Sequence, residues 1–237
     1  MKFTEEVLDY LRGNKFSNNF EFQAANDGDL VDRLEFLESL AKNRKVLHFG
    51  FTDHVPLIKS KYSKNEWLHK RLVDVSEKCV GIDIDDDAVQ FVKEELSIQN
   101  VYALDILEDD IPKEILDEEW DYLILGEVLE HINDPVRFLE GIKRRLEANF
   151  KIIVITVPNA WDLNNLIRLP SNKELINSDH RFWFSPYTLA KVVTESGYSV
   201  RNVRHAQTYM PETWWQRWIV RRYPMTRETI ILEASAD

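Results

Sequence analysis

The sequence predicts an α/β fold built on a parallel, doubly wound sheet. Short apolar runs recur along the chain, and stretches with apolar residues at helical spacing separate them. With 237 residues, 44% of them hydrophobic, the chain is long and apolar enough for one sizeable core. Apolar strands that alternate with helices favour parallel pairing, because each crossover helix packs back onto a face of the sheet.

The expected elements begin with two amphipathic helices, at residues 4–12 and 29–42. They form an expected N-terminal helical extension over residues 1–43, which precedes the main domain over 44–237. Strands are then expected at 45–49, 79–84, 101–104, 122–125 and 151–157, with helices between them at 65–75, 86–96 and 135–146.

The C-terminal third has a different pattern. A helix is expected to begin at Ser185, because serine caps helix N-termini and the proline that follows fits the first helical position. Two further strands, at 199–205 and 229–234, enclose an insertion of about 207–226 that is rich in tryptophan and arginine. The two strands favour a hairpin at the edge of the sheet, and a separate C-terminal subdomain is the alternative.

The charge of the chain is negative and unevenly distributed. The formal net charge of −11 argues against broad affinity for nucleic acid. Residues 104–121 hold nine acids and one lysine, whereas residues 198–227 hold six arginines and one acid. Two solvated faces of opposite sign would explain this. The sharper interpretation is that the basic region meets an anionic part of a substrate, such as a phosphate or a lipid headgroup.

The sequence also carries indications of its compartment. The single cysteine, Cys79, excludes a disulfide within the chain and suits a reducing compartment. The first residues lack the apolar stretch of a signal peptide, and no apolar run is long enough to span a membrane. We therefore expect a soluble, cytoplasmic protein.

The strongest candidate for a functional site is formed by Glu127, Glu130 and His131. They follow an apolar strand that is expected to run into a helix, where positions i, i+3 and i+4 share one face. Ligands of open α/β sheets bind at the carboxyl ends of the strands. Two carboxylates and an imidazole at that edge predict a metal ion or a hydroxyl group to be deprotonated.

Other polar residues end the preceding strands. The first strand runs into Gly50, where a polar loop lets the backbone approach a ligand. Asp83 ends the second strand, and a carboxylate there can accept both hydroxyls of a ribose. Asp105 follows the third strand and suits either an adenine amino group or a simple turn.

Taken together, these positions resemble the class I S-adenosylmethionine-dependent methyltransferases, over residues 45–205. The run from Glu127 to Pro135 is typical of the broad family that includes the ubiquinone-pathway O-methyltransferases. The resemblance implies a Rossmann-like, seven-stranded sheet with an antiparallel last strand, and S-adenosylmethionine as cofactor. Asp83 would bind its ribose, Asp105 its adenine and the Gly50 loop its methionine part. The implied cofactor-binding residues are Gly50, Thr52, Asp53, Asp83, Ile84, Asp105, Ile106 and Gly126.

The first loop departs from the family pattern. That pattern reads Gly-x-Gly-x-Gly, with an acid two positions before the first glycine; here Thr52 and His54 replace two glycines and His48 replaces the acid. Missing glycines limit the approach of the backbone, so side chains of this loop are expected to contact the methionine group instead. The loop is similar to those of bacterial methyltransferases associated with glycan biosynthesis.

A second, narrower resemblance concerns Glu127, Glu130 and His131 together with His180 downstream. Small-RNA 3′-terminal 2′-O-methyltransferases carry a similar pair of segments, in which two glutamates and two histidines hold a divalent ion. The resemblance implies that these four residues hold a divalent ion, which would orient a vicinal diol and lower the pKa of its hydroxyl. Two carboxylates suit Mg²⁺, whereas two imidazoles favour Mn²⁺, Fe²⁺ or Zn²⁺, and the expected metal is Mg²⁺ or Mn²⁺. Glu127 and His131 would be the catalytic residues, and His131 acting as general base without a metal is the rival interpretation.

The sequence thus predicts an O-methyltransferase that acts on a hydroxyl of a sugar, a glycan or another small diol. One alternative acceptor is the terminal ribose of an RNA, and an alternative of another class is a binding protein that has lost catalysis. The insertion leaves three interpretations open: a peripheral membrane contact, stacking on sugars or a lid, and core packing with surface arginines. Its residues of interest are Trp214, Trp215, Arg217, Trp218, Arg221 and Arg222.

Overall fold

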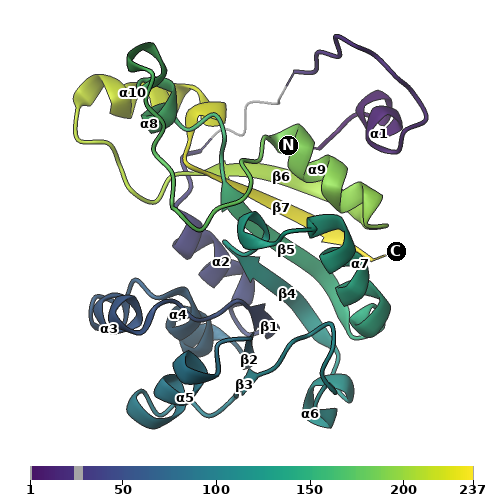
Figure 1. Ribbon diagram of the computed structural model, residues 1–237, viewed down its shortest axis with the longest axis vertical. Helices are drawn as coiled ribbons and strands as arrows, with labels where there is room; N and C mark the ends of the chain where they lie inside the picture. The colour runs from purple at the N-terminus through teal and green to yellow at the C-terminus, as the bar shows by residue number, and fades with distance from the viewer. Residues whose placement is uncertain (1, 24–28, 237) are drawn as a thin grey trace.

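A computed structural model describes residues 2–23 and 29–236 and shows one seven-stranded sheet in the order β3-β2-β1-β4-β5-β7-β6 (Figure 1). The strands are β1 (Lys45–Phe49), β2 (Lys78–Asp83), β3 (Val101–Ala103), β4 (Trp120–Gly126), β5 (Phe150–Pro158), β6 (Ser199–Ala206) and β7 (Thr229–Ser235). The first five are parallel, and β7 is antiparallel to both β5 and β6. The expected α/β fold with an antiparallel last strand is confirmed. Residues 1, 24–28 and 237, which the two expected domain ranges include, lie outside the described residues.

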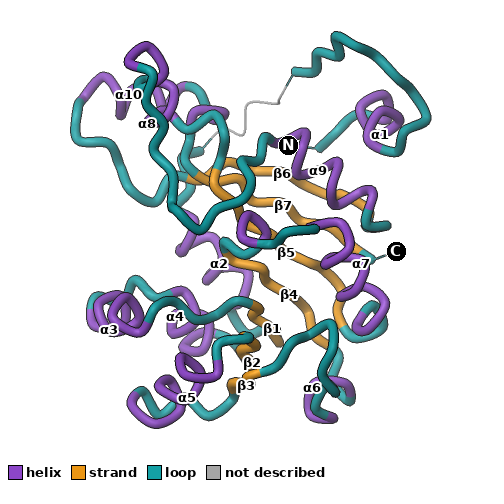
Figure 2. Tube along the Cα trace, in the orientation of Figure 1, coloured by secondary structure: helices purple, strands orange, loops and turns teal. Residues whose placement is uncertain are grey.

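The helices cover both faces of the sheet (Figure 2). They are α1 (Glu5–Leu11), α2 (Arg33–Ala41), α3 (Val55–Ser63), α4 (Leu68–Val75), α5 (Asp86–Glu95), α6 (Lys113–Leu116), α7 (Pro135–Leu146), α8 (Leu163–Leu166), α9 (Pro186–Glu195) and α10 (Trp214–Arg222). Three short 3₁₀ helices are η1 (Leu129–His131), η2 (Leu169–Ser171) and η3 (Pro224–Thr226). The sequence pattern missed α3, although a proline at its start fits the first helical turn. No helix in the described ranges is long and apolar enough to cross a membrane.

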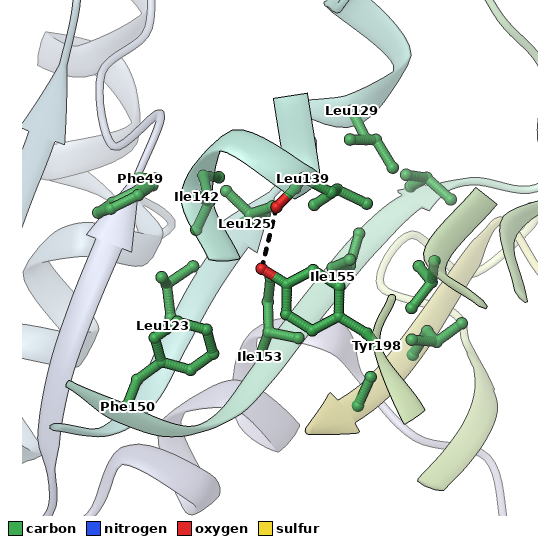
Figure 3. Close-up of a cluster of buried hydrophobic side chains, with 14 of the residues drawn as sticks. Phe49, Leu123, Leu125, Leu129, Leu139, Ile142, Phe150, Ile153, Ile155 and Tyr198 are labelled. Carbon is green, nitrogen blue, oxygen red and sulfur yellow. Dashed lines mark hydrogen bonds between the residues drawn. The ribbon is translucent and has the colours of Figure 1, made fainter. Parts of the chain in front are cut away.

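The larger core lies on the face covered by α1, α6, α7 and α9. Apolar side chains of the central strands pack there against these helices, and Figure 3 shows Leu123, Leu125, Ile153 and Ile155 among them. Tyr198 belongs to this cluster, and its hydroxyl donates a hydrogen bond to the Leu139 carbonyl at 3.1 Å. The buried phenol therefore ties the turn before β6 to α7.

The opposite face carries a smaller core. Alternate residues of the strands, such as Val46 and Ile124, pack there against Leu34, Leu37 and Leu72 of α2 and α4. This alternation follows from the two-residue period of a strand. A third cluster packs α3 and α5 over the β3 end of the sheet. Helices thus pack on both faces of the sheet, and the candidate site lies at the carboxyl ends of its strands.

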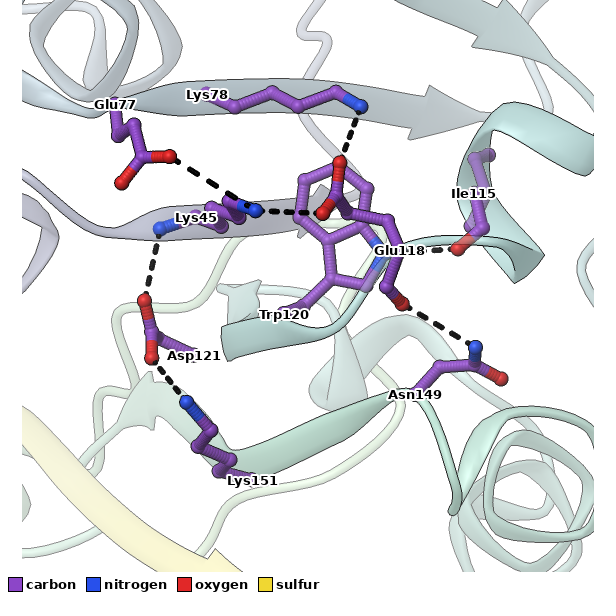
Figure 4. A network of polar contacts seen from close by, with 9 residues as sticks. All are labelled: Lys45, Glu77, Lys78, Ile115, Glu118, Trp120, Asp121, Asn149 and Lys151. Carbon is purple, nitrogen blue, oxygen red and sulfur yellow. Dashed lines mark hydrogen bonds and ion pairs between the residues drawn. The ribbon is translucent and has the colours of Figure 1, made fainter.

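A polar network closes the other edge of the sheet, at the amino ends of the strands (Figure 4). The Glu118 carboxylate pairs with Lys45 Nζ at 2.6 Å and with Lys78 Nζ at 2.9 Å. Asp121 pairs with Lys151 at 2.8 Å and accepts a hydrogen bond from the Lys45 backbone N–H. These acids come from the acidic stretch of residues 104–121, so part of its charge stabilises the fold.

Candidate functional site

The carboxyl ends of β1, β2, β3 and β4 bring the expected cofactor-binding residues to one edge of the sheet (Figure 1). Gly50 follows β1 with φ +63°, a left-handed conformation that favours glycine. A Cβ atom on Gly50 would overlap the side chain of Val128. Glycine is therefore required at this position by the backbone conformation and by the close packing of Val128, which lies in the turn after β4.

The Asp83 carboxylate links two loops of this edge. Its Oδ2 accepts a hydrogen bond from the backbone N–H of Thr52 at 2.9 Å, and its Oδ1 accepts one from Asp85 at 3.1 Å. The side chain of Ile84, beside it, is 77% exposed. Asp83 and Ile84 therefore present a fixed carboxylate and an open apolar surface next to each other.

The remaining expected cofactor residues have other local roles. Asp105 Oδ1 accepts a hydrogen bond from the backbone of Leu107, so Asp105 shapes its own turn. The side chain of Ile106 is buried in the larger core. Gly126 packs towards the α4 side, since a Cβ atom on it would meet Leu68. Asp53 pairs with the Lys61 ammonium group at 2.5 Å.

The segment that follows β4 differs from the expectation. Residues 127–131 do not form an α-helix: Glu127 has φ +60° and Leu129–His131 form a single 3₁₀ turn. The i, i+3, i+4 face is therefore absent. The left-handed Glu127 instead turns the chain before the 3₁₀ turn that carries Glu130 and His131.

Glu130 is the most unusual residue of the site. Its side chain is fully buried, and neither carboxylate oxygen has a hydrogen-bond partner. Its Oε1 lies 3.9 Å from His180 Nε2. Ligand atoms of Glu130, His131 and His180 all lie within 4.8 Å of one another. The fold thus brings together three of the four expected metal ligands, although His131 and His180 are 49 positions apart in the sequence.

The two histidines are fixed around this carboxylate. Their rings meet edge to face with centroids 4.7 Å apart. His131 Nδ1 lies 3.2 Å from the Asp179 carbonyl, which can only accept a hydrogen bond. Nδ1 of His131 is therefore the donor, and Nε2 of the neutral ring keeps its lone pair. His180 Nδ1 is buried without a partner.

Glu127, the fourth expected ligand, stands beside this three-residue cluster. Its Oε1 is buried without a hydrogen-bond partner and lies 3.9 Å from Arg33 Nη1. Arg33 begins α2 and is not suggested by any motif of the sequence. Its guanidinium group partly balances the charge of Glu127 at this edge of the site.

The environment changes how these groups titrate. Burial, and then the neighbouring charge of Glu127, raise the pKa of Glu130 to about 9. Burial, and then His131, lower the pKa of His180 below its usual range. The raised pKa of Glu130 means that a bound cation would displace its proton, whereas the lowered pKa of His180 favours the neutral imidazole, which is the form that binds a metal.

A cavity of about 210 Å³ opens beside Glu127. Its wall is formed by the ends of β5 and β7, the α8 segment and the chain that follows β6. The residues that line it include Arg33, Glu127, Asp162, Asn165, Trp183 and Glu228. Trp183 also meets His180 edge to face, with ring centroids 6.3 Å apart. The cavity therefore adjoins the Glu130, His131 and His180 cluster.

The carboxylates of this cavity are oriented by the backbone. Glu228 Oε1 accepts hydrogen bonds from the N–H groups of Thr208 and Tyr209, at 2.6 and 3.1 Å. Asp162 Oδ1 accepts one from Asn164 at 3.2 Å. These residues are far apart in the sequence, and no local pattern marks them as parts of one cavity.

His48 of β1 and His69 of α4 form a separate buried pair. Their Nδ1 atoms are 3.2 Å apart, so one ring donates and the other accepts. Burial lowers the pKa of both rings, that of His69 to about 3. His48, which stands where the resemblance expects an acid, is thus a neutral packed residue, and His205 is buried as well.

A family model described as a methyltransferase domain matches residues 22–203, which is more than half of the chain. The chain belongs to this methyltransferase family. With the strand order and the antiparallel β7, it has the class I methyltransferase fold. No curated protein sequence matches the chain.

Several solved methyltransferases have a similar fold. The small RNA methyltransferase HEN1 is 16% identical with a TM-score of 0.59, over 93% of this chain and 27% of that chain. A methyltransferase from Aquifex aeolicus is 16% identical with a TM-score of 0.52, over 86% and 89%. Magnesium protoporphyrin IX methyltransferase from Synechocystis with bound SAH is 12% identical with a TM-score of 0.51, over 98% and 94%. This methyltransferase thus spans about a quarter of the HEN1 chain.

The unusual first loop of this methyltransferase is well anchored without the second and third glycines. Phe51 is buried in the third cluster, and its carbonyl accepts a hydrogen bond from Trp67 Nε1 at 3.1 Å. The backbone of Thr52 is tied to Asp83. His54 precedes α3 with an exposed side chain, 4.0 Å from Asp179. The loop therefore runs from Asp83, in the expected cofactor site, towards Asp179, next to the expected metal ligand His180.

Proposed function

We propose that this methyltransferase transfers the sulfonium methyl group of S-adenosylmethionine to a hydroxyl oxygen of a sugar, a glycan or another small diol. We further propose that a divalent ion, Mg²⁺ or Mn²⁺, assists the transfer and is bound by Glu130, His131 and His180, with Glu127 as the fourth ligand. The observation that carries the proposal is the fully buried Glu130 carboxyl group, whose oxygens lack partners.

The surroundings of Glu130 fit a cation better than they fit a structural carboxyl group. A buried polar group without a hydrogen bond destabilises a protein by about 1–3 kcal/mol. His131 matches the usual pattern of a metal ligand, in which one ring nitrogen donates to a carbonyl and the other faces the metal. Carboxylate and imidazole ligands together suit Mn²⁺, whereas carboxylates alone suit Mg²⁺.

The cofactor is expected at the ends of β1 and β2. Asp83 offers a carboxylate that two backbone N–H groups hold in place, as ribose recognition requires. The exposed side chain of Ile84 offers an apolar surface for the base beside it. Gly50 lets the first loop pass close to Val128, so the methionine end of the cofactor would point towards the turn that carries Glu130.

The chemistry requires a deprotonated or polarised hydroxyl in line with the methyl group. A divalent cation, when bound, lowers the pKa of a coordinated hydroxyl and orients a vicinal diol. Glu127 lines the acceptor cavity, and its Oε1, which has no hydrogen-bond partner, can accept a hydrogen bond from a hydroxyl group. His131 is the alternative proton acceptor for a mechanism without a metal. Precise positioning does much of the work in such a displacement.

The cavity favours a neutral, hydroxyl-rich acceptor. Three carboxyl groups, from Glu127, Asp162 and Glu228, line it, and its arginine, Arg33, lies beside Glu127. Such a lining attracts hydroxyl donors and repels phosphates. Trp183 provides an aromatic surface at the same wall. These features, with the net charge of −11, favour a sugar over the terminal ribose of an RNA.

A methyl-transfer assay tests the proposal. Chelator-stripped protein and methyl-labelled S-adenosylmethionine are incubated with neutral glycans, simple diols and a short RNA, with and without Mn²⁺. We expect label in a glycan or diol only with the metal, and much less with Glu130→Gln than with the exposed control Glu140→Gln. Methyl label in the RNA alone would show that the acceptor is a ribose of RNA and not a glycan or diol. Binding of S-adenosylhomocysteine without any transfer would support the non-catalytic alternative.

A further inference from the structure

Helix α10 presents an exposed face on which tryptophan and arginine alternate. Trp214, Arg217, Trp218 and Arg221 are spaced by three and four residues, so they lie on one side of the helix. The side chains of Trp214 and Trp218 are 80% and 57% exposed. Val220 is the one fully buried residue of the helix. We call these four residues the tryptophan face.

The tryptophan face has a charge opposite to that of the protein. Helix α10 contains three arginines and no acid, whereas the whole chain carries a net charge of −11. An approaching anionic surface is therefore attracted to this end of the molecule and repelled by the acidic stretch of residues 104–121. This uneven charge is expected to turn the tryptophan face towards an anionic surface.

Further exposed apolar side chains flank the tryptophan face. Leu169, Leu175 and Ile176 follow α8 and are 61%, 53% and 43% exposed. Both segments project at the same end of the molecule, beyond the sheet (Figures 1 and 2). The exposed apolar side chains thus come from two segments at this end of the molecule.

The helix is fixed in this exposed position. The buried Arg227 guanidinium group donates to the Val220 carbonyl at 3.0 Å and to the His205 carbonyl at 3.1 Å. Arg217 Nε donates to the Pro211 carbonyl at 2.7 Å. The Arg227 bonds join α10 to β6, and the Arg217 bond joins α10 to the loop before it, so the position of the helix is fixed by the fold.

We propose that the tryptophan face binds a bilayer that contains anionic lipids. Indole rings favour the headgroup region of a membrane, and arginines next to them pair with lipid phosphates. A helix with this composition on its outer face is typical of an interfacial helix that lies in the plane of the membrane. Scattered exposed apolar residues are ordinary, whereas several exposed tryptophan, leucine and isoleucine side chains at one end of the molecule indicate an interaction surface.

Binding in this orientation affects the acceptor cavity. Leu175 and Tyr209, which are 53% and 66% exposed, belong both to this end of the molecule and to the lining of the cavity. The membrane would therefore lie next to the cavity mouth, and an acceptor anchored in lipid could reach it. That consequence rests on the proposed function, whereas the binding of the bilayer does not.

Vesicle flotation tests the inference. The purified protein is mixed with vesicles of phosphatidylcholine alone or with phosphatidylglycerol added, at low and high salt. We expect flotation only with the anionic vesicles, and less of it at high salt. The double variants Trp214→Ser/Trp218→Ser and Arg217→Gln/Arg221→Gln should each bind at least about tenfold more weakly. Phe16→Ser and Lys42→Gln/Lys64→Gln, which alter exposed residues elsewhere, should bind like the parent.

The outcomes separate the alternatives. Absence of binding to anionic vesicles at low salt would overturn the inference, as would binding that both double variants retain. Self-association that the tryptophan variants abolish, without any vesicle binding, would assign the face to a second copy of the chain. Thermal unfolding of each variant shows that it is folded, and S-adenosylhomocysteine binding reports on the cofactor site independently of the membrane.

Discussion

Gly50 at the end of β1 packs directly against Val128 in the turn after β4, with no space for a Cβ atom between them. One residue belongs to the loop expected to hold the cofactor, and the other precedes the 3₁₀ turn that carries Glu130 and His131. The two halves of the candidate site therefore share a van der Waals contact. We therefore expect substitutions at Gly50 and Val128 to be energetically coupled.

Substitution Gly50→Ala should lower the free energy of unfolding by about 2–4 kcal/mol, from the left-handed backbone and the overlap with Val128 together. Adding Val128→Ala should restore only the part caused by the overlap. A double-mutant cycle from denaturant unfolding measures this coupling. Additive effects of the two substitutions would show that the contact does not exist.

Substitution Glu130→Met should stabilise the metal-free protein by about 1–3 kcal/mol, because it removes a buried carboxyl group without partners. The same variant should lose transfer activity. Denaturant unfolding in the presence of a chelator, compared with Glu140→Met on the exposed side of α7, provides the measurement. A loss of stability in Glu130→Met would mean that the carboxyl group is structural.

Substitution Asp83→Asn should weaken the binding of S-adenosylhomocysteine by about tenfold to a hundredfold, the effect of losing hydrogen bonds to a charged acceptor. The neighbouring Asp87→Asn, on the exposed start of α5, should leave the affinity unchanged. Isothermal calorimetry gives both dissociation constants. Equal affinities for the two variants would remove Asp83 from the ribose site.

The acid stability of the fold should depend on Glu118. Hydrogen bonds from Lys45 and Lys78 lower the pKa of its carboxyl group to about 2. A lowered pKa stabilises the folded state above pH 4.5, and this contribution is lost as the pH falls through about 2. Glu118→Gln should therefore be less stable than the parent at pH 7, and the difference should vanish near pH 2. Unfolding of Glu119→Gln over the same pH range serves as the control.

The order of strands and helices was predictable because each depends on local residue patterns. The expected range 45–49 coincides with β1, and the expected range 135–146 coincides with α7. The pairing of β6 with β7 at the edge of the sheet also follows from the two apolar runs around the insertion. Periodicity of apolar residues contains this information directly.

The geometry of the site was less predictable. The expected helix at 127–131 was wrong because Glu127 adopts a positive φ, which residue patterns seldom indicate outside glycine and asparagine. The contact between Arg33 and Glu127 joins residues that are 94 positions apart, and Glu228 reaches the cavity from the position just before β7. Such contacts depend on tertiary packing, so no short segment of the sequence contains them.

The most direct test of the account is a calorimetric titration of Mn²⁺ into chelator-stripped protein. We predict one binding site in the parent, an affinity at least about tenfold lower in Glu130→Gln and in His180→Gln, and an unchanged affinity in Glu140→Gln. Thermal unfolding of each variant confirms that it is folded. Absence of metal binding in the parent, or equal binding in Glu130→Gln, would contradict the metal-assisted site.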